Sequence, residues 1–313
     1  MVSCLVTGGA GFIGSHLVEA LVARGMRVRV LDDLSTGRVA NLAAVQGKIE
    51  TITASISDPQ AVAAAVTGVD WVFHLAAIAS VQSSLEDPLR THDVCATGTL
   101  RVLEAARRAG VRRVIYAASA SAYGPLASGA QRESDPLEPQ SPYAAAKLAG
   151  EHYCQAFTTS YGLETVRLRF FNVFGPRQDP QSPYSGVIAL FIAAMLTNKP
   201  VMVHDDGRQS RDFVYVADAV QALLKAAEAP LPGKVYNIGS GRSSTILELL
   251  GGLNAILGTA VVPIHGPARP GDVRHSLAAI DLATRDLNYH PSMSFADGLR
   301  ATVDWYRREG PTS

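Results

Sequence analysis

Tyr143 and Lys147 are the residues of this sequence whose types and spacing most directly indicate proton chemistry. They stand four positions apart after Ser141-Pro142, which is typical of a helix start, so both side chains are expected on one helical face. An ammonium group beside a phenol favours the phenolate, so we expect Lys147 to lower the pKa of Tyr143 from about 10 towards that of a general base. Ser119, just past a strand-like run, could relay a proton from the same substrate hydroxyl. Alone, a Tyr-x-x-x-Lys pair is also common by chance on amphipathic helices.

A glycine-rich turn stands near the start of the chain. Gly8, Gly11 and Gly14 follow a strand-like run and open a helical pattern. Such a turn is tight, lets the backbone approach a pyrophosphate and presents a helix N-terminus to the anion. Asp32 ends the second strand-like run, 24 positions after Gly8, where a carboxylate binds an adenosine ribose and repels a 2′-phosphate. The pattern predicts a site that binds NAD rather than NADP; the alternative is a glycine-rich connection beside a surface acid.

The elements that must position these residues alternate along the first half of the chain. Strand-like runs cover residues 4–7, 27–31, 49–53, 71–75, 114–118 and 165–169, and helical patterns cover residues 14–24, 59–67, 89–109 and 143–160. Strict alternation predicts parallel strands, helices on both sheet faces, and ligands beyond the carboxyl ends of the strands. Beyond residue 170, prolines interrupt this rhythm. We therefore predict an α/β fold, with a Rossmann-type doubly wound parallel sheet over residues 1–170 and a smaller α/β substrate lobe over residues 171–313, partly interleaved with the first.

Composition and charge exclude several classes of protein. The 313 residues carry 28 basic and 28 acidic side chains, and this balance argues against a nucleic-acid-binding protein. The longest clean apolar stretch, residues 186–196, spans 11 positions, whereas a membrane-spanning helix needs roughly 20. No secretion signal precedes the first strand-like run. The three cysteines are scattered and the eight histidines show no ligand spacing, so we expect reduced thiols, a cytoplasmic protein and no metal site.

The motifs together resemble one known family over essentially the whole chain. The glycine turn, Asp32, His74-Leu75-Ala76-Ala77, Ser119 and the Tyr143/Lys147 pair are similar to those of the extended short-chain dehydrogenase/reductases, and within them to the UDP-glucose 4-epimerase family. The resemblance implies that Ser119, Tyr143 and Lys147 are catalytic and that NAD is the cofactor. It implies that NAD contacts Gly8, Gly11, Phe12, Ile13, Gly14, Asp32, Ser55, Ile56, Leu75, Ala76, Ala77, Tyr143, Lys147 and Phe170.

Two positions depart from the usual pattern of that family. Ser55 stands where an Asp usually contacts the cofactor, and Cys95 stands where an Asn is usual. Each departure removes one expected polar contact with the cofactor. We expect NAD still to bind, with an affinity that differs from that of other family members.

Motifs in the second half of the chain resemble those with which the family binds a UDP-sugar. Asn172 matches the residue that holds the diphosphate, and Arg211 and Arg269 match its phosphate-binding arginines. A guanidinium fork suits phosphate better than an ammonium does. Asp272 matches the acid on the uridine ribose, and Tyr184 could stack on the base or belong to the core. The substrate residues implied in this way are Ser119, Ser121, Tyr143, Asn172, Tyr184, Arg211, Arg269, Asp272 and Ser276.

The residues after Ser119 bear on the reaction. Family members that eliminate water carry an acid pair at the next two positions, and decarboxylating members carry a Glu at the second, because these steps need a further acid or base. Here the two positions are Ala120 and Ser121. We therefore expect an NAD-dependent isomerase that inverts C4 of a UDP-hexose through its 4-ketose.

A small residue at one position bears on the sugar. Ser276 stands where family members confined to UDP-glucose and UDP-galactose carry a Tyr, so we expect UDP-GlcNAc and UDP-GalNAc to be accepted as well. A UDP-glucuronate 4-epimerase remains the nearest alternative. A non-catalytic NAD-sensing protein is the other, although such a protein should lack the Tyr or the Lys. The resemblance also implies a homodimer, formed by residues 89–109 and the helix from Tyr143 with their copies.

Overall fold

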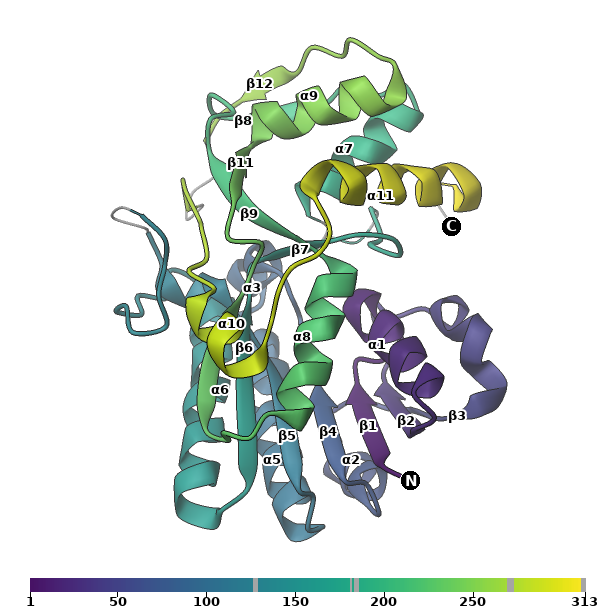
Figure 1. Cartoon of the computed structure of the whole chain (residues 1–313), viewed down its shortest axis with the longest axis vertical. Coiled ribbons are helices and arrows are strands. Elements are labelled where there is room, and N and C mark those ends of the chain that lie inside the picture. The colour runs from purple at the N-terminus through teal and green to yellow at the C-terminus, as the bar shows by residue number, and fades with distance from the viewer. Residues whose placement is uncertain (126–128, 181, 183–185, 269–272, 311–313) are drawn as a thin grey trace.

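Seven parallel strands form the centre of the molecule (Figure 1). The structure, a computed structural model, describes residues 1–125, 129–180, 182, 186–268 and 273–310. The strand order is β10-β6-β5-β4-β1-β2-β3. The strands are β1 (Ser3–Thr7), β2 (Arg27–Asp32), β3 (Ile49–Thr53), β4 (Trp71–His74), β5 (Arg113–Ser119), β6 (Glu164–Phe170) and β10 (Lys234–Ile238). This sheet confirms the doubly wound parallel fold that the alternating pattern predicts.

Helices cover both faces of the sheet, which is why the central strands β1, β4 and β5 are buried along nearly their whole length. On one face, α2 (Pro59–Val66), α5 (Gly98–Arg108) and α6 (Pro142–Tyr161) bury Val62, Val102 and Phe157 against the strands. On the other face, α1 (Phe12–Ala23) and α8 (Val216–Glu228) bury Leu17 and Leu223. The connecting elements are η1 (Val39–Lys48), α3 (Val81–Glu86), η3 (Ala120–Tyr123) and α10 (Asp281–Leu287). In the part of the chain that the structure describes, no helix is long and apolar enough to span a membrane.

The helix predicted for residues 89–109 is confirmed as an uninterrupted helical run, with a π-helical turn in its middle that the pattern did not predict. It consists of α4 (Pro88–His92), a π-helical turn η2 (Asp93–Thr97) and α5. The Thr99 hydroxyl donates to the Cys95 carbonyl at 2.6 Å, and a side chain at Gly98 would collide with Ile56, 2.8 Å away. The close approach to Ile56 and the widened turn lie where the helix faces the site, and π-helical turns are frequent at functional sites.

An upper lobe stands over the carboxyl ends of the strands (Figure 1). It contains the sheet β11-β9-β7 and the strand pair β12-β8, with a core around Phe174, Phe213 and Leu253. Its elements are β7 (Asn172–Phe174), α7 (Val187–Leu196), β8 (Met202–His204), β9 (Ser210–Tyr215), β11 (Ser243–Thr245), α9 (Ile246–Leu257), β12 (Ile264–Gly266) and α11 (Phe295–Glu309). Strand β10 and helix α8 follow residue 170 in the chain and still belong to the central sheet layers. The division at residue 170 stays a prediction.

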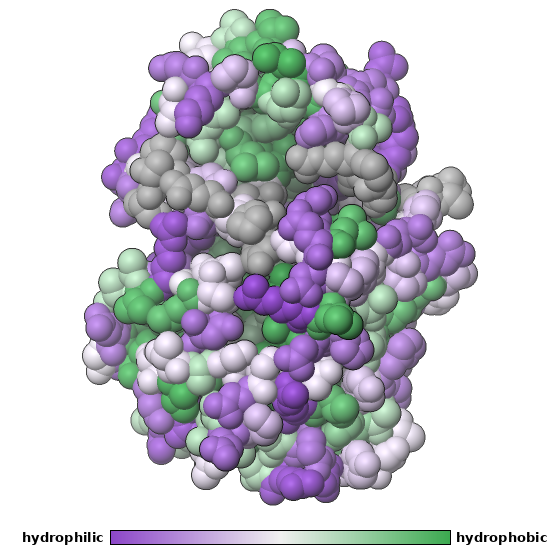
Figure 2. Space-filling model, turned by 180° about the vertical axis from the view of Figure 1, so that it is seen from behind, coloured by the Kyte–Doolittle hydropathy of each residue, from purple (hydrophilic) through white to green (hydrophobic). Residues whose placement is uncertain are grey.

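The surface seen from behind mixes apolar and hydrophilic patches over both the sheet layers and the upper lobe (Figure 2). Cys4, Cys95 and Cys154 are all buried free thiols, as the scattered spacing predicts.

Candidate active site

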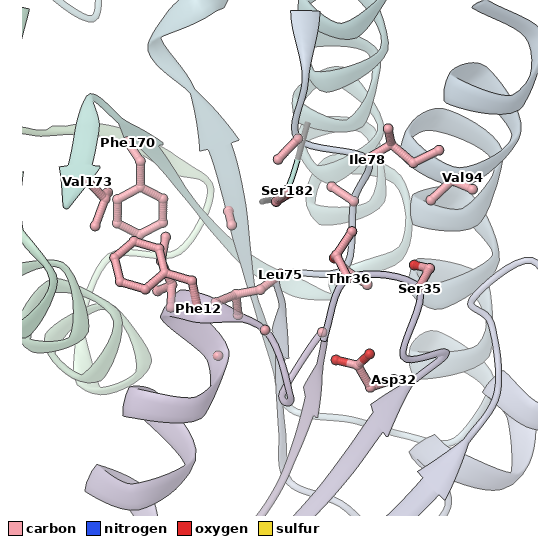
Figure 3. Close-up of a pocket in the computed structure, with 18 of the residues that line it drawn as sticks. Phe12, Asp32, Ser35, Thr36, Leu75, Ile78, Val94, Phe170, Val173 and Ser182 are labelled. Carbon is pink, nitrogen blue, oxygen red and sulfur yellow. The ribbon is translucent and has the colours of Figure 1, made fainter. Parts of the chain in front are cut away.

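A cavity of about 450 Å³ lies at the carboxyl ends of the sheet strands, between the sheet and the upper lobe. In Figure 3, Phe12 and Phe170 stand at one side of this cavity and Asp32 at the other. Of the predicted cofactor residues, those that line it are Gly8, Gly11, Phe12, Ile13, Gly14, Asp32, Ile56, Leu75, Ala76, Ala77, Tyr143, Lys147 and Phe170. Ser55 is not among the lining residues; its hydroxyl accepts a hydrogen bond from the Ser57 N–H at 3.1 Å.

The glycine turn forms a cradle that side chains would fill. Gly8 has a φ of +70°, and a Cβ built on Gly14 would lie 2.1 Å from the Gly8 carbonyl oxygen. Gly11 is the N-cap of α1 and has no side-chain cap. The first-turn N–H groups of a helix lack partners within the helix, so this turn offers donors and a positive dipole end to an anion. These residues therefore fit the pyrophosphate of a dinucleotide.

Asp32 is held rigidly at the cavity wall. Its Oδ2 accepts from the Ala10 N–H and its Oδ1 from the Leu34 N–H, both at 2.9 Å. Burial raises the pKa of the carboxyl, and these two N–H donors oppose the rise. Each oxygen keeps acceptor capacity, which suits the two hydroxyls of an adenosine ribose.

Part of this wall was not assigned to the site from the sequence. After Asp32, the cavity is also lined by Asp33, Ser35, Thr36, Arg38 and Asn41, and from the upper lobe by Arg177, Gln178 and Asp179. The first group follows the carboxyl end of a strand directly, which is a signal that could have found it. Arg38 and Asp179 form an ion pair at 2.7 Å. Because these residues are far apart in the chain, no local sequence pattern could have predicted their pairing.

Ser119, Tyr143 and Lys147 line the same cavity, so the structure brings the predicted catalytic residues together. Ser119 is the last residue of β5, and its Oγ accepts from the Ser121 hydroxyl at 2.9 Å. Ser141 caps α6 by accepting the Ala144 N–H at 3.2 Å, with Pro142 in the first turn. The end of β5 and the start of α6 therefore place the Ser119 hydroxyl, the Tyr143 phenol and the Lys147 amine around the same cavity.

The pKa of Tyr143 does not follow the expectation from its spacing to Lys147. Burial raises it to about 12, the nearby Cys95 thiol adds to the rise, and the hydrogen bond with Ser119 opposes it. Burial also lowers the pKa of Lys147. The expected lowering of the Tyr143 pKa by Lys147 is therefore wrong for the protein without cofactor, because burial disfavours the phenolate.

A second cavity, of about 230 Å³, adjoins the first and shares Ser119, Phe170, Phe171 and Asn172 with it. Three other predicted substrate residues, Ser121, Arg211 and Ser276, line this space. The Arg211 guanidinium donates to the carbonyls of Ser210 and Arg274 at 2.9 and 3.2 Å. Tyr184, Arg269 and Asp272 lie outside the described residues.

The second cavity has little charge. Its described lining contains no Asp, Glu, His or Lys, and Arg211 is the one charged residue in that part of the wall. Ser276 is 9% exposed, and its Oγ has no hydrogen-bond partner among the described residues. A polar ligand there could therefore bind a hydroxyl and a guanidinium, while proton transfer would depend on Ser119 and Tyr143.

His74 joins two elements of the site through a directed hydrogen-bond chain. Thr99 donates to the Cys95 carbonyl, so its oxygen accepts from Nε2–H of His74 at 3.0 Å. Thr7 then donates to Nδ1 at 2.7 Å and accepts from the Ala76 N–H at 3.3 Å. This assignment satisfies every group with a neutral imidazole.

The neutral state of His74 predicts a pH dependence of stability. Burial, with Lys147 nearby, lowers the pKa of His74 from 6.5 to about 3. Because the unfolded chain binds this proton more readily, the free energy of unfolding is fully retained above about pH 6.5 and falls as pH decreases, by up to about 1.4 kcal/mol per pH unit. Urea unfolding at pH 7, 6 and 5 should show a shallower slope for His74→Gln than for the wild type. An equal slope would contradict the assignment, and His152→Gln, at an exposed position of α6, is the control.

Comparisons with known proteins find relatives along the whole chain. The family model described as the NAD dependent epimerase/dehydratase family matches residues 4–239. A UDP-glucose 4-epimerase of Mycolicibacterium smegmatis is 38% identical, over 97% of this chain and 98% of that protein. The UDP-N-acetylglucosamine 4-epimerase of Methanobrevibacter ruminantium, solved with UDP-N-acetylmuramic acid, has a TM-score of 0.94 and 37% identity over 98% of this chain and 99% of that one. The UDP-glucose 4-epimerase of Thermus thermophilus, solved with NAD, has a TM-score of 0.90 and 38% identity over the same shares, 98% and 99%.

Proposed function

The chain belongs to the NAD dependent epimerase/dehydratase family, and from this membership we propose that it inverts C4 of a UDP-hexose through a transient 4-ketose. The cofactor is NAD. The glycine turn and the N-terminus of α1 would hold its pyrophosphate, and Asp32 would hold its adenosine ribose. We propose UDP-GlcNAc and UDP-GalNAc as substrates beside UDP-Glc and UDP-Gal.

The proton steps belong to three side chains. When bound, NAD supplies the hydride acceptor and a positively charged ring that favours a nearby phenolate. Tyr143 then accepts the proton of the C4 hydroxyl through its Oη as C4 becomes a ketone. After the bound ketose has rotated, the hydride removed from C4 would be returned to the opposite face, and Tyr143 returns a proton to the same oxygen. Ser119 hydrogen-bonds this oxygen during both steps, and Lys147 keeps a positive charge beside the dinucleotide.

We propose epimerisation because the described lining of the adjoining cavity contains no second acid or base. Loss of water across two carbons needs an acid at one and a base at the next, and the positions after Ser119 are Ala120 and Ser121. The Ser121 hydroxyl donates to Ser119, so it supports that residue. A ketose formed here would therefore be reduced back to a hexose.

Purified protein incubated separately with UDP-GlcNAc, UDP-Glc and UDP-glucuronate tests the proposal. We expect C4 epimers from the first two sugars, detected chromatographically, with no net consumption of NAD. Product from UDP-glucuronate alone would support the uronate alternative, and a 4-keto-6-deoxy product would show a dehydratase. Absence of any conversion by NAD-loaded protein would support the NAD-sensing alternative.

Ser276→Tyr should separate the two pairs of sugars. An aromatic ring at this buried position would occupy more space than an acetamido group, so we expect kcat/KM for UDP-GlcNAc to fall about 100-fold, with little change for UDP-Glc. Coupled assays on both sugars measure this ratio, and Ser276→Ala, which keeps the side chain small, is the control. An undiminished rate with UDP-GlcNAc would show that Ser276 does not set the size of the sugar pocket.

We also propose a homodimer and retain the predicted cytoplasmic location. Leu85, Leu89 and Tyr153, in α3, α4 and α6, are 53%, 82% and 39% exposed. These apolar side chains support an isologous contact through the helices that carry them.

A further inference from the structure

Lys147 lies against the ring of Tyr116, a residue of β5 outside the predicted catalytic set. Its Nζ is 4.5 Å from the ring centroid, a distance typical of a cation–π contact. The Tyr116 hydroxyl donates to the main-chain carbonyl of the same lysine at 3.2 Å. Tyr116 is 0% exposed and Lys147 4% exposed. One tyrosine therefore contacts both ends of the residue, the backbone and the ammonium.

This contact matters because the ammonium has no carboxylate partner among the described residues to fix its position. A lysine carries its charge on a flexible four-carbon stem. No salt bridge of the described residues includes Lys147, and Glu151, one turn further along α6, is paired with Arg169 at 2.8 Å. A buried cation without a carboxylate partner is stabilised by an electron-rich ring face, and more strongly so where water is excluded.

The ring of Tyr116 is itself fixed. Its strand pairs with β4 and β6, and a Cβ on Gly150 would lie 2.3 Å from the Tyr116 hydroxyl oxygen, so α6 fits closely around it. The His74 imidazole packs against the ring with centroids 5.7 Å apart. Because His74 is held neutral between Thr7 and Thr99, it brings no second cation to the ring that faces Lys147.

We propose that Tyr116 is a positioning residue for Lys147, holding the ammonium at the cavity wall through its ring face and the backbone of that turn through its hydroxyl. The functional part of this proposal rests on the proposed epimerase activity. The ring does not touch substrate, so its removal should slow turnover and leave sugar binding nearly unchanged.

A ring-current shift provides a test that does not depend on turnover. Protons held over an aromatic face resonate upfield, and the chain has five lysines, Lys48, Lys147, Lys199, Lys225 and Lys234. In protein with 13C-labelled lysine, we expect an upfield ε-methylene signal that disappears in Lys147→Arg, which assigns it. This signal should persist in Tyr116→Phe and move to an ordinary position in Tyr116→Leu. If Tyr116→Leu fails to fold, the wild-type spectrum decides, since an unshifted Lys147 signal overturns the proposal.

Kinetics of the same variants give the functional readout. For Tyr116→Leu we expect kcat to fall about 30-fold, which corresponds to about 2 kcal/mol at 1.36 kcal/mol per tenfold, with KM for the sugar nearly unchanged. Tyr116→Phe should recover most of this loss, because it keeps the ring. The matched control is Tyr289, which is equally buried and donates to the Gly239 carbonyl at 2.9 Å; Tyr289→Phe and Tyr289→Leu should affect stability without changing the Lys147 signal.

The outcomes separate this proposal from the proposed function. A shifted Lys147 signal that is lost in Tyr116→Leu, in protein that converts no UDP-sugar, would support the positioning role and refute the epimerase activity. Turnover by the wild type with a full kcat in Tyr116→Leu would refute the positioning role alone.

Discussion

Tyr143→Phe should lower kcat for sugar epimerisation about 10³-fold and leave the fold intact. The substitution removes only the phenolic oxygen, and general acid–base catalysis by a positioned group contributes about 10² to 10⁴-fold. Ser119 lies close enough to hydrogen-bond this oxygen, but a hydroxyl alone is too weak a base to replace it. Steady-state rates with UDP-Glc, together with thermal unfolding, measure both parts of the prediction.

The control for this variant is Tyr161→Phe. Tyr161 lies on the same helix, α6, and is 59% exposed, so its hydroxyl has no part in the cavity chemistry. Both variants should bind NAD and unfold like the wild type. If Tyr143→Phe kept wild-type turnover, Tyr143 would not be the base, and the choice of Ser119 and Lys147 as its partners would lose its basis.

Six of the seven strands of the central sheet could be predicted because their sequence signals are local, whereas β10 comes from the part of the chain assigned to the substrate lobe. Each of the six expected strands is observed with bounds that differ by no more than one residue. The central strands β1, β4 and β5 are buried along nearly their whole length, as expected where helices cover both sheet faces. The site could be located for the same reason. Asp32 and Ser119 stand at carboxyl ends of parallel strands, and Gly8 to Gly14 join a strand to a helix, so topology alone brings them to one edge.

The parts that could not be predicted depend on contacts between distant residues. The π-helical turn at Cys95 accompanies the tight packing of Gly98 on Ile56. The direction of the Tyr143 pKa shift depends on burial, which spacing along a helix does not reveal. The contact between Lys147 and Tyr116 joins a helix to a strand 31 positions earlier. In each case the residue types are known from the sequence, but their contacts and burial are determined by the tertiary structure and could not be predicted from it.

Gly14→Ala should weaken NAD binding about 100-fold and destabilise the protein. A methyl group there would lie 2.1 Å from the Gly8 carbonyl oxygen and 2.8 Å from the Gly9 Cα, and both obstacles are backbone atoms that no side-chain rotation can remove. The turn must open, at a cost of about 1–3 kcal/mol for such overpacking. Opening moves the N–H groups that would bind the pyrophosphate, and about 2.8 kcal/mol corresponds to the expected loss of affinity. Calorimetric titration of NAD into protein freed of cofactor measures it.

The same substitution at Gly251 should have the opposite effect on stability. Gly251 is exposed within α9, and a Cβ there meets nothing within 4 Å, so only helix propensity acts, and Ala is favoured over Gly by about 1 kcal/mol. We therefore expect Gly251→Ala to raise the free energy of unfolding and to bind NAD like the wild type. Because Gly14 is also helical, helix propensity would favour Ala there too. The opposite signs of the two changes in the free energy of unfolding would therefore show the effect of the collision between a Cβ at position 14 and the glycine turn. Tight NAD binding by Gly14→Ala would show that the pyrophosphate does not rest on this turn.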